Sequence, residues 1–205
     1  MSRVPVVWRF VVGLSLCACS SNDGDGGSNE DEVPDLSTVA GFLTAEARAF
    51  CSKLYECCSA DDLMANPQAR DSASDCAAFT RSATSNFSAH TDAVAAQRLE
   101  YDAAMGQQCI DNYPLWSCDD VRAGTLGAVA SCAETLVPKV MPGGSCEQSY
   151  ECIDTWCDYG DRICVQRKAD GEPCNLYLEC ASGYCELGVG CSVPPATSNR
   201  FCRGF

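Results

Sequence analysis

The sequence predicts an α-helical domain followed by a small disulfide-rich tail of two short cysteine-rich repeats built from strands and turns. Residues 36–140 are rich in alanine, leucine and other helix-forming residues, and their cysteines lie far apart. In residues 141–205 alanine nearly vanishes and the cysteines crowd together. The spacing of the cysteines also repeats within this tail. These three observations divide the chain at about residue 140.

Residues 1–18 predict a secretory signal peptide. Arg3 and Arg9 accompany a short apolar segment that ends at residue 18. A helix that spans a bilayer takes about 20 apolar residues, so this segment is too short to be one. A basic start followed by a short apolar centre is typical of an export signal that is removed from the mature chain.

The end of this segment, Leu16-Cys17-Ala18-Cys19, resembles the lipobox of bacterial lipoproteins. The resemblance implies that cleavage follows Ala18 and that Cys19 carries acyl chains, which hold the protein on a lipid bilayer. Ser20 stands where enteric lipoproteins retained in the inner membrane carry aspartate, which favours an outer-membrane address in the cell envelope. The alternatives are Cys17 as the acylated residue and an ordinary cleaved signal with a free secreted product.

Residues 19–35 predict a disordered acidic tether. They contain six acidic residues and almost nothing apolar, so they cannot bury enough surface to offset the entropy of ordering. Without residues 1–18 the chain keeps 12 basic and 28 acidic residues, a formal charge of −16. A charge of this sign argues against a nucleic-acid partner.

Capping signals and helical spacing predict four helices and one short turn in residues 36–140. Thr44 is the expected cap of the first helix, and Ser59 and Ser117 are each followed by an aspartate at capping distance. The apolar residues and cysteines that recur at helical spacing are expected to form the core. For the last helix these are Val121, Leu126, Val129, Cys132 and Leu136. The expected helices cover residues 44–58, 72–87, 90–113 and 117–137, and the short turn covers residues 59–66.

Sixteen cysteines remain after the signal and Cys19 are set aside, an even number that predicts eight disulfides in an oxidising compartment. No two cysteines are separated by two residues, so the hook typical of zinc ribbons is absent. We therefore expect neither a metal nor another cofactor. The expected disulfide residues are Cys51, Cys57, Cys58, Cys76, Cys109, Cys118, Cys132, Cys146, Cys152, Cys157, Cys164, Cys174, Cys180, Cys185, Cys191 and Cys202.

The connectivity is constrained at one point. Cys57 and Cys58 are adjacent, so we expect them to bond to different partners, because a vicinal ring strains the backbone. The helical region holds seven cysteines, an odd number, so one of them is expected to reach the tail. Cys202 is the candidate partner, and this bond would fold the end of the chain back onto the helices.

The tail contains an internal repeat. Residues 146–164 align with residues 174–191 at a shift of 28 residues, with one deletion before the last cysteine. Glu151 aligns with Glu179 in the same register. Each repeat has too few apolar residues for a core, so crosslinks are expected to replace packing. In the chain-entropy model a disulfide that closes 15 residues contributes about 3 kcal/mol.

The cysteine ladder, the Gly-x-x-Cys entries at Gly143 and Gly171, and the Gly-Tyr-Cys run at residues 183–185 resemble the N-terminal cysteine-rich repeat of Dickkopf proteins. The pattern is also similar to the tails of myxobacterial-type surface lipoproteins. It covers about 50 of the 205 residues, and Ala181 stands where animal repeats commonly carry a second cysteine. The resemblance implies a scaffold and an extracellular setting. Dickkopf proteins are receptor antagonists, but cysteine spacing reports the scaffold and not the partner.

Catalytic motifs are absent from the sequence, which has no nucleophile elbow, zinc-protease helix or phosphate-binding loop. The single histidine, His90, is expected to be an exposed polar residue near a helix start. Tyr150, Tyr159 and Tyr177 have no aromatic counterpart in the other repeat, which makes them candidates for binding a protein or glycan partner.

The sequence therefore predicts a membrane-anchored extracytoplasmic lipoprotein with a non-catalytic role in binding or in envelope structure. One alternative is a secreted or surface inhibitor or receptor-like module presented by the repeats. The other is a hydrolase, which would need a pocket in the helical domain with carboxylates converging around a tyrosine or serine.

Overall fold

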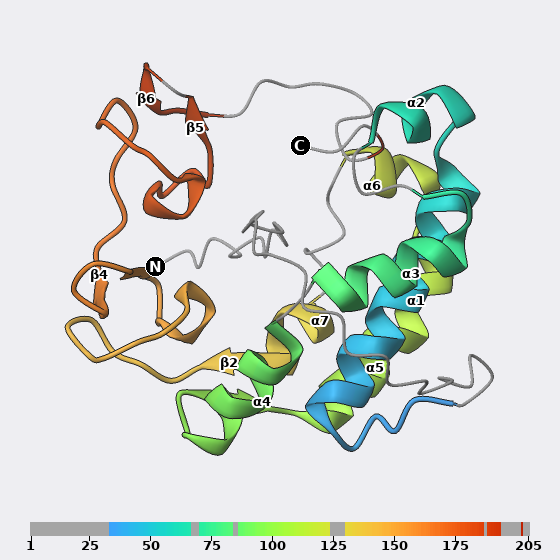
Figure 1. Cartoon of the computed structure of the whole chain (residues 1–205), viewed down its shortest axis with the longest axis horizontal. Helices are drawn as coiled ribbons and strands as arrows, with labels where there is room; N and C mark the ends of the chain where they lie inside the picture. The colour runs from blue at the N-terminus through green and yellow to red at the C-terminus, as the bar shows by residue number, and fades with distance from the viewer. Residues whose placement is uncertain are drawn as a thin grey trace, which may run out of the picture.

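A computed structural model describes residues 33–66, 70–83, 86–123, 130–186, 188–193 and Cys202. The helices precede the tail, and three small antiparallel ladders complete the structure described in these ranges (Figure 1). The coarse prediction of a small disulfide-rich fold with helices and short strands is confirmed. The expected signal peptide, Cys19 and most of the expected tether lie outside the described residues.

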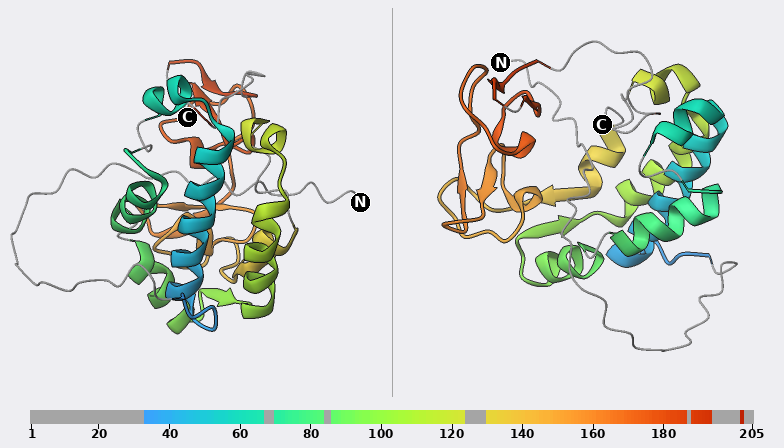
Figure 2. Two further views of the ribbon diagram at one scale, coloured as in Figure 1. Left: turned by 90° about the vertical axis from the view of Figure 1, so that its right-hand side faces the viewer. Right: turned by 45° about the horizontal axis from the view of Figure 1, so that its top comes forward.

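Helix α1 (Val39–Cys57) is the centre of the helical region and contacts α3 (Ala73–Ala83), α4 (Asn86–Ala95), α5 (Ala103–Asn112) and α6 (Cys118–Ala123). It runs between α3 and α5 (Figure 2). No helix in the described part of the chain combines the length and the apolar content needed to cross a bilayer.

The first helix begins earlier than the sequence predicted. Thr38 caps α1, because its side chain accepts a hydrogen bond from the backbone N–H of Gly41. Thr44, the expected cap, lies inside the helix and donates its hydroxyl to the carbonyl of Ala40. Both threonines have a small polar side chain suited to a cap, so the prediction chose the wrong one.

Three shorter helices begin with the same Ser-x-x-Asp pattern. In each of them the serine hydroxyl accepts from the backbone N–H of the aspartate and donates to its carboxylate. The caps expected at Ser59 and Ser117 are confirmed, and Ser72 does the same at the third helix. The helices that follow these serines are α2 (Ala60–Ala65), α3 and α6.

The single helix expected over residues 90–113 is wrong. The structure divides this segment into the end of α4, strand β1 (Leu99–Tyr101) and α5. Gln97 has a φ of +59°, which ends the helical path, and Asp102 then caps α5 by accepting two backbone N–H groups. The chain thus contains its own stop and start signals within an alanine-rich stretch.

The expected last helix is also shorter than predicted. Helix α7 (Ala130–Thr135) ends before Leu136, which begins strand β2 (Leu136–Pro138). This strand pairs antiparallel with β1, with Leu99 opposite Pro138. The expected core positions Leu126 and Val129 lie outside the described residues.

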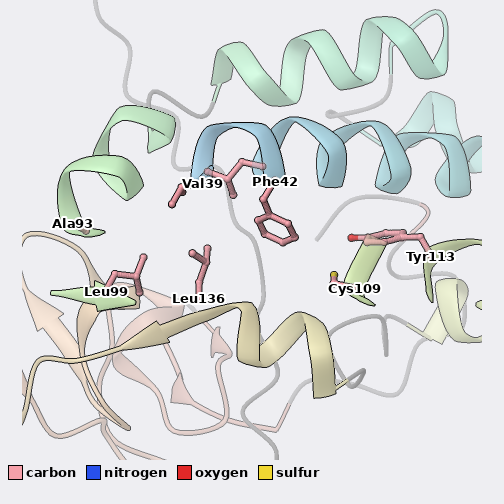
Figure 3. Close-up of a cluster of buried hydrophobic side chains, with 8 residues drawn as sticks. Val39, Phe42, Ala93, Leu99, Cys109, Tyr113 and Leu136 are labelled. Carbon is pink, nitrogen blue, oxygen red and sulfur yellow. The ribbon is translucent and has the colours of Figure 1, made fainter. Parts of the chain in front are cut away.

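The two strands complete the main core. Phe42 of α1 and Leu136 of β2 point into the same space, and Leu99 of β1 lies beside them (Figure 3). Gly106 lets α5 approach closely, because a Cβ atom there would lie 3.2 Å from Phe42 and 2.9 Å from the hydroxyl of Tyr101. The other members of this core are Val39, Leu43, Ala93, Cys109 and Tyr113.

Disulfides join the helices to one another. Cys51–Cys76 joins α1 to α3, Cys57–Cys118 joins α1 to α6, and Cys109–Cys132 joins α5 to α7. The two adjacent cysteines bond to different partners, because Cys58 pairs with Cys202. This last bond joins positions 144 residues apart and returns the tail to the end of α1.

From the Cys58–Cys202 bond we predict which fragments stay together when an enzyme cleaves the chain after lysine. The chain has three lysines, and the side chains of Lys139 and Lys168 are 47% and 36% exposed, against 8% for Lys53. After cleavage at Lys168, residues 169–205 should remain attached until a reductant is added. In the double variant Cys58→Ser/Cys202→Ser the same fragment should be released without reductant. Release of this fragment from the unreduced native chain, seen by mass, would contradict the pairing.

Candidate interaction site

The tail consists of two segments with the same disulfide pattern, which we name the first unit (residues 140–165) and the second unit (residues 168–193). In each of them the first cysteine bonds to the third and the second to the fourth. The first unit contains β3 (Trp156–Asp158) and β4 (Ile163–Val165), and the second contains β5 (Cys185–Glu186) and β6 (Gly190–Cys191). The bonds are Cys146–Cys157, Cys152–Cys164, Cys174–Cys185 and Cys180–Cys191.

The entry glycines of the two units occupy equivalent places. Gly143 has a φ of +81° and donates its N–H to the carbonyl of Cys164 at 2.7 Å. Gly171 has a φ of +89° and donates to the carbonyl of Cys191, also at 2.7 Å. Glycine adopts this left-handed conformation without steric cost, which explains why both units begin with it.

Each unit buries one glutamate on a short 3-10 turn, η3 (Ser149–Glu151) in the first unit and η4 (Tyr177–Glu179) in the second. Glu151 is 0% exposed and Glu179 is 5% exposed. Each carboxylate accepts from the backbone N–H four residues earlier, at 2.8 Å and 3.4 Å respectively. A buried carboxylate also needs a positive partner, because the loss of its hydration is costly.

The two units obtain that positive partner from different places. Glu179 is paired with Lys168 of its own unit, at 2.5 Å. Glu151 is paired with Arg98, 3.0 Å away, which lies immediately before β1 in the helical region. Arg98 also reaches Glu147 at 3.2 Å. The first unit therefore depends on the helical region for the charge that balances its buried carboxylate.

A ring contact extends the same junction. Tyr150 stacks on His90 of α4 with ring centroids 4.0 Å apart and the planes inclined by 11°. The expectation that His90 is exposed is wrong, since it is 5% exposed and lies in the middle of α4. Burial, and then the negative charge of Glu151, raise the pKa of Tyr150 well above its usual value. Its ring is used for contact within the molecule.

Tyr159 occupies a more open position. Its side chain is 44% exposed, and its ring meets Trp156 edge-on with centroids 6.4 Å apart. Its hydroxyl lies 3.5 Å from the hydroxyl of Ser149. The ring is therefore held by neighbours while a large part of it faces solvent.

Tyr177 of the second unit completes the group. It is half-buried, and burial together with the nearness of Tyr159 raises its pKa to about 12, so it is neutral at physiological pH. Arg167 lies between the units, donates its Nε–H to the carbonyl of Thr155 at 3.3 Å and interacts with Tyr177. We name these residues together the aromatic seam, which comprises Tyr150, Trp156, Tyr159, Arg167 and Tyr177.

The three tyrosines singled out from the sequence thus belong to one group, with Tyr159 near both others. Sequence reasoning missed Arg98, whose role depends on a fold that brings it to Glu151 across more than 50 positions. The alignment of Glu151 with Glu179 was visible in the sequence, and it was the available signal that both carboxylates have a structural role.

Other groups of ionisable or sulfur-containing side chains are also present in the described residues. Glu46 of α1 accepts a hydrogen bond from Tyr113, and burial raises the pKa of Glu46 to about 7. The hydrolase considered as an alternative needs two carboxylates that reach a substrate. Glu46 and Tyr113 together supply only one carboxylate. Cysteine sulfurs also gather in each tail unit at distances that a metal could bridge, but all of them are bonded in disulfides.

No protein-family model, curated protein or solved structure matches this chain. The resemblance of the tail to Dickkopf repeats, and that of the N-terminus to lipoprotein signals, therefore stay predictions from the residues that carry them.

Proposed function

We propose that this protein is a lipid-anchored extracytoplasmic protein that binds a partner through the aromatic seam and has no catalytic role. The observation that carries the proposal is Tyr159, a 44% exposed ring that meets Trp156 edge-on and lies near the tyrosines Tyr150 and Tyr177 of the two units. Tyrosine and tryptophan offer a large contact area at a low entropic cost, which is why they are enriched at interfaces. The disulfides of the two units add rigidity to this surface.

The cysteine inventory supports the proposed location. The disulfides of residues 51–202 use sixteen cysteines, which leaves Cys17 and Cys19 for the N-terminal segment. Disulfide-rich domains belong to oxidising compartments, in agreement with export. We propose that Cys17 leaves with the signal peptide and that acylated Cys19 anchors the chain to the envelope, at the outer membrane.

The two units are proposed to be a true internal repeat of the Dickkopf-like type. Their equal disulfide pairings, entry glycines and buried glutamates support this. The buried glutamates of the two units have positive partners from different places, which supports different roles for the units. The first unit is attached to the helical region through Arg98 and Tyr150, and the second unit extends the seam. A surface inhibitor or receptor-like module would use the same seam, whereas a purely structural envelope protein would not need an exposed aromatic ring.

The anchor is tested by fractionation of cells that express the full chain. The variant Cys19→Ser should move from the membrane fraction to the soluble fraction, because the acylated side chain is lost. The matched control Cys17→Ser should stay with the membrane. The intact mass, measured after alkylation without reduction, should correspond to residues 19–205 plus acyl chains with no alkyl adduct. Release by Cys17→Ser would move the anchor to that residue, and an unlipidated native mass would contradict a lipid anchor.

A further inference from the structure

The charges around the aromatic seam indicate the chemistry of its partner. Residues 141–193 contain nine acidic and three basic residues, a formal charge of −6. Of these basic residues, Lys168 pairs with Glu179 and Arg167 interacts with Asp154, while Arg162 is exposed next to Asp161, so the acidic residues outnumber the basic ones three to one. An anionic partner would therefore meet net repulsion at this surface.

Tyr159 lies in an acidic turn. Asp158 and Asp161 flank it, and Asp161 is exposed. One carboxylate oxygen of Asp158 accepts the backbone N–H groups of Gly160 and Asp161, which fixes the turn that presents the ring. An aromatic face carries partial negative charge and attracts cations, and adjacent carboxylates add to that attraction.

We infer that the aromatic seam receives a lysine or arginine side chain from a basic segment of a partner protein, with the cationic group against the exposed ring of Tyr159 and near Asp161. The inference rests on the proposed binding function and specifies its partner. Arg162 is exposed next to Asp161, but the carboxylates of Asp158 and Asp161 outnumber it in this turn. Arg167 donates its Nε–H to the carbonyl of Thr155 and interacts with Asp154.

The test uses the full, disulfide-intact chain with tyrosine rings labelled for NMR. The first probe is a blocked hexapeptide of alternating glycine and lysine, and the second is the same peptide with every lysine acetylated, which keeps the length and removes the charge. The lysine peptide should shift the ring signals of Tyr159 and Tyr177. The acetylated peptide should bind several-fold more weakly, since a cation–π contact contributes roughly 0.5–2 kcal/mol, or about 2- to 30-fold in affinity.

Two variants with a matched control make the result specific. Tyr159→Leu removes the aromatic face and keeps an apolar side chain, and Asp161→Asn removes the neighbouring charge, so each should weaken binding of the lysine peptide severalfold. Asp61→Asn removes the same charge from an exposed position on α2 and should leave binding unchanged. Unfolding midpoints and the absence of free thiols establish that the variants are folded.

Each outcome decides the inference. Equal binding of both peptides would overturn the inference. The seam would remain a binding surface, but its partner would be a neutral glycan or peptide. The inference would also be overturned if Asp61→Asn weakened binding as strongly as Asp161→Asn, or if Tyr159→Leu had no effect. Either result would show that the peptide binds by general electrostatic attraction. Failure of the lysine peptide to bind would overturn it too, whereas failure of the anchor proposal would be detected separately by fractionation of Cys19→Ser.

Discussion

Replacing Arg98 with methionine is expected to lower the free energy of unfolding by about 3 kcal/mol, because the substitution leaves a buried carboxylate without its positive partner. Glu151 is 0% exposed, and its carboxylate has Arg98 as its ion-pair partner at 3.0 Å. The other carboxylate oxygen of Glu151, Oε1, is buried without a hydrogen-bond partner in the described structure. The charge of Glu151 therefore depends strongly on the ion pair with Arg98. Methionine keeps most of the aliphatic stem of the arginine, so the loss of stability is caused by the loss of the positive charge. Urea unfolding at neutral pH, with all disulfides intact, measures it.

Two further variants separate charge from packing. The double variant Arg98→Met/Glu151→Gln should recover a large part of the lost stability, because it removes the buried charge together with its partner. Lys168→Met in the second unit makes the equivalent change and should cost less, since the side chain of Lys168 is 36% exposed whereas that of Arg98 is 23% exposed. A loss below about 1 kcal/mol for Arg98→Met, the size of an exposed ion pair, would show that the first unit does not need this charge.

The same residue explains why the tail should be studied within the whole chain. The first unit takes its charge partner from Arg98 and its ring partner from His90, and Cys202 bonds to Cys58. A fragment that begins at residue 141 would leave Glu151 without its positive partner Arg98 and Cys202 as a free thiol. Binding experiments on such a fragment would then test a different surface from the native one.

Local signals in the sequence predicted local structure well. The Ser-x-x-Asp caps at Ser59 and Ser117 are confirmed, because a cap depends on atoms only three residues apart. The coarse combination of helices and short strands in a disulfide-rich chain was also predicted. In the described part of residues 141–193 the helical pieces are single 3-10 turns.

Pairings between distant segments could not be predicted in this way. Residues 99–101 lie in an alanine-rich stretch with helical spacing, and they form a strand because residues 136–138 pair with them. That pairing depends on tertiary context, which overrides local propensity. The candidate site follows the same rule, since its tyrosines were recognisable by composition, whereas the burial of Tyr150 against His90 depends on the docking of two distant segments.

A second large effect is expected in the pH dependence of stability, and its source is Glu46. Burial raises the pKa of Glu46 from 4.5 to about 7, although the hydrogen bond from Tyr113 favours the charged form. The carboxyl therefore binds its proton more tightly in the folded chain than in the unfolded chain. Its contribution to stability is complete below about pH 4.5 and is lost progressively as the pH rises to about 7. The difference between the two pKa values corresponds to a loss of about 3 kcal/mol.

The variant Glu46→Gln should remove this dependence, because a glutamine carbonyl can still accept from Tyr113 but carries no charge. Its free energy of unfolding should match that of the native chain near pH 4 and exceed it by up to about 3 kcal/mol at pH 8. The control Glu134→Gln removes a carboxylate from an exposed position on α7 and should leave the native pH profile in place. If Glu46→Gln kept the decline in stability between pH 4.5 and pH 7, another group would have to be its source, and the core of α1 would accommodate an ionised glutamate without cost.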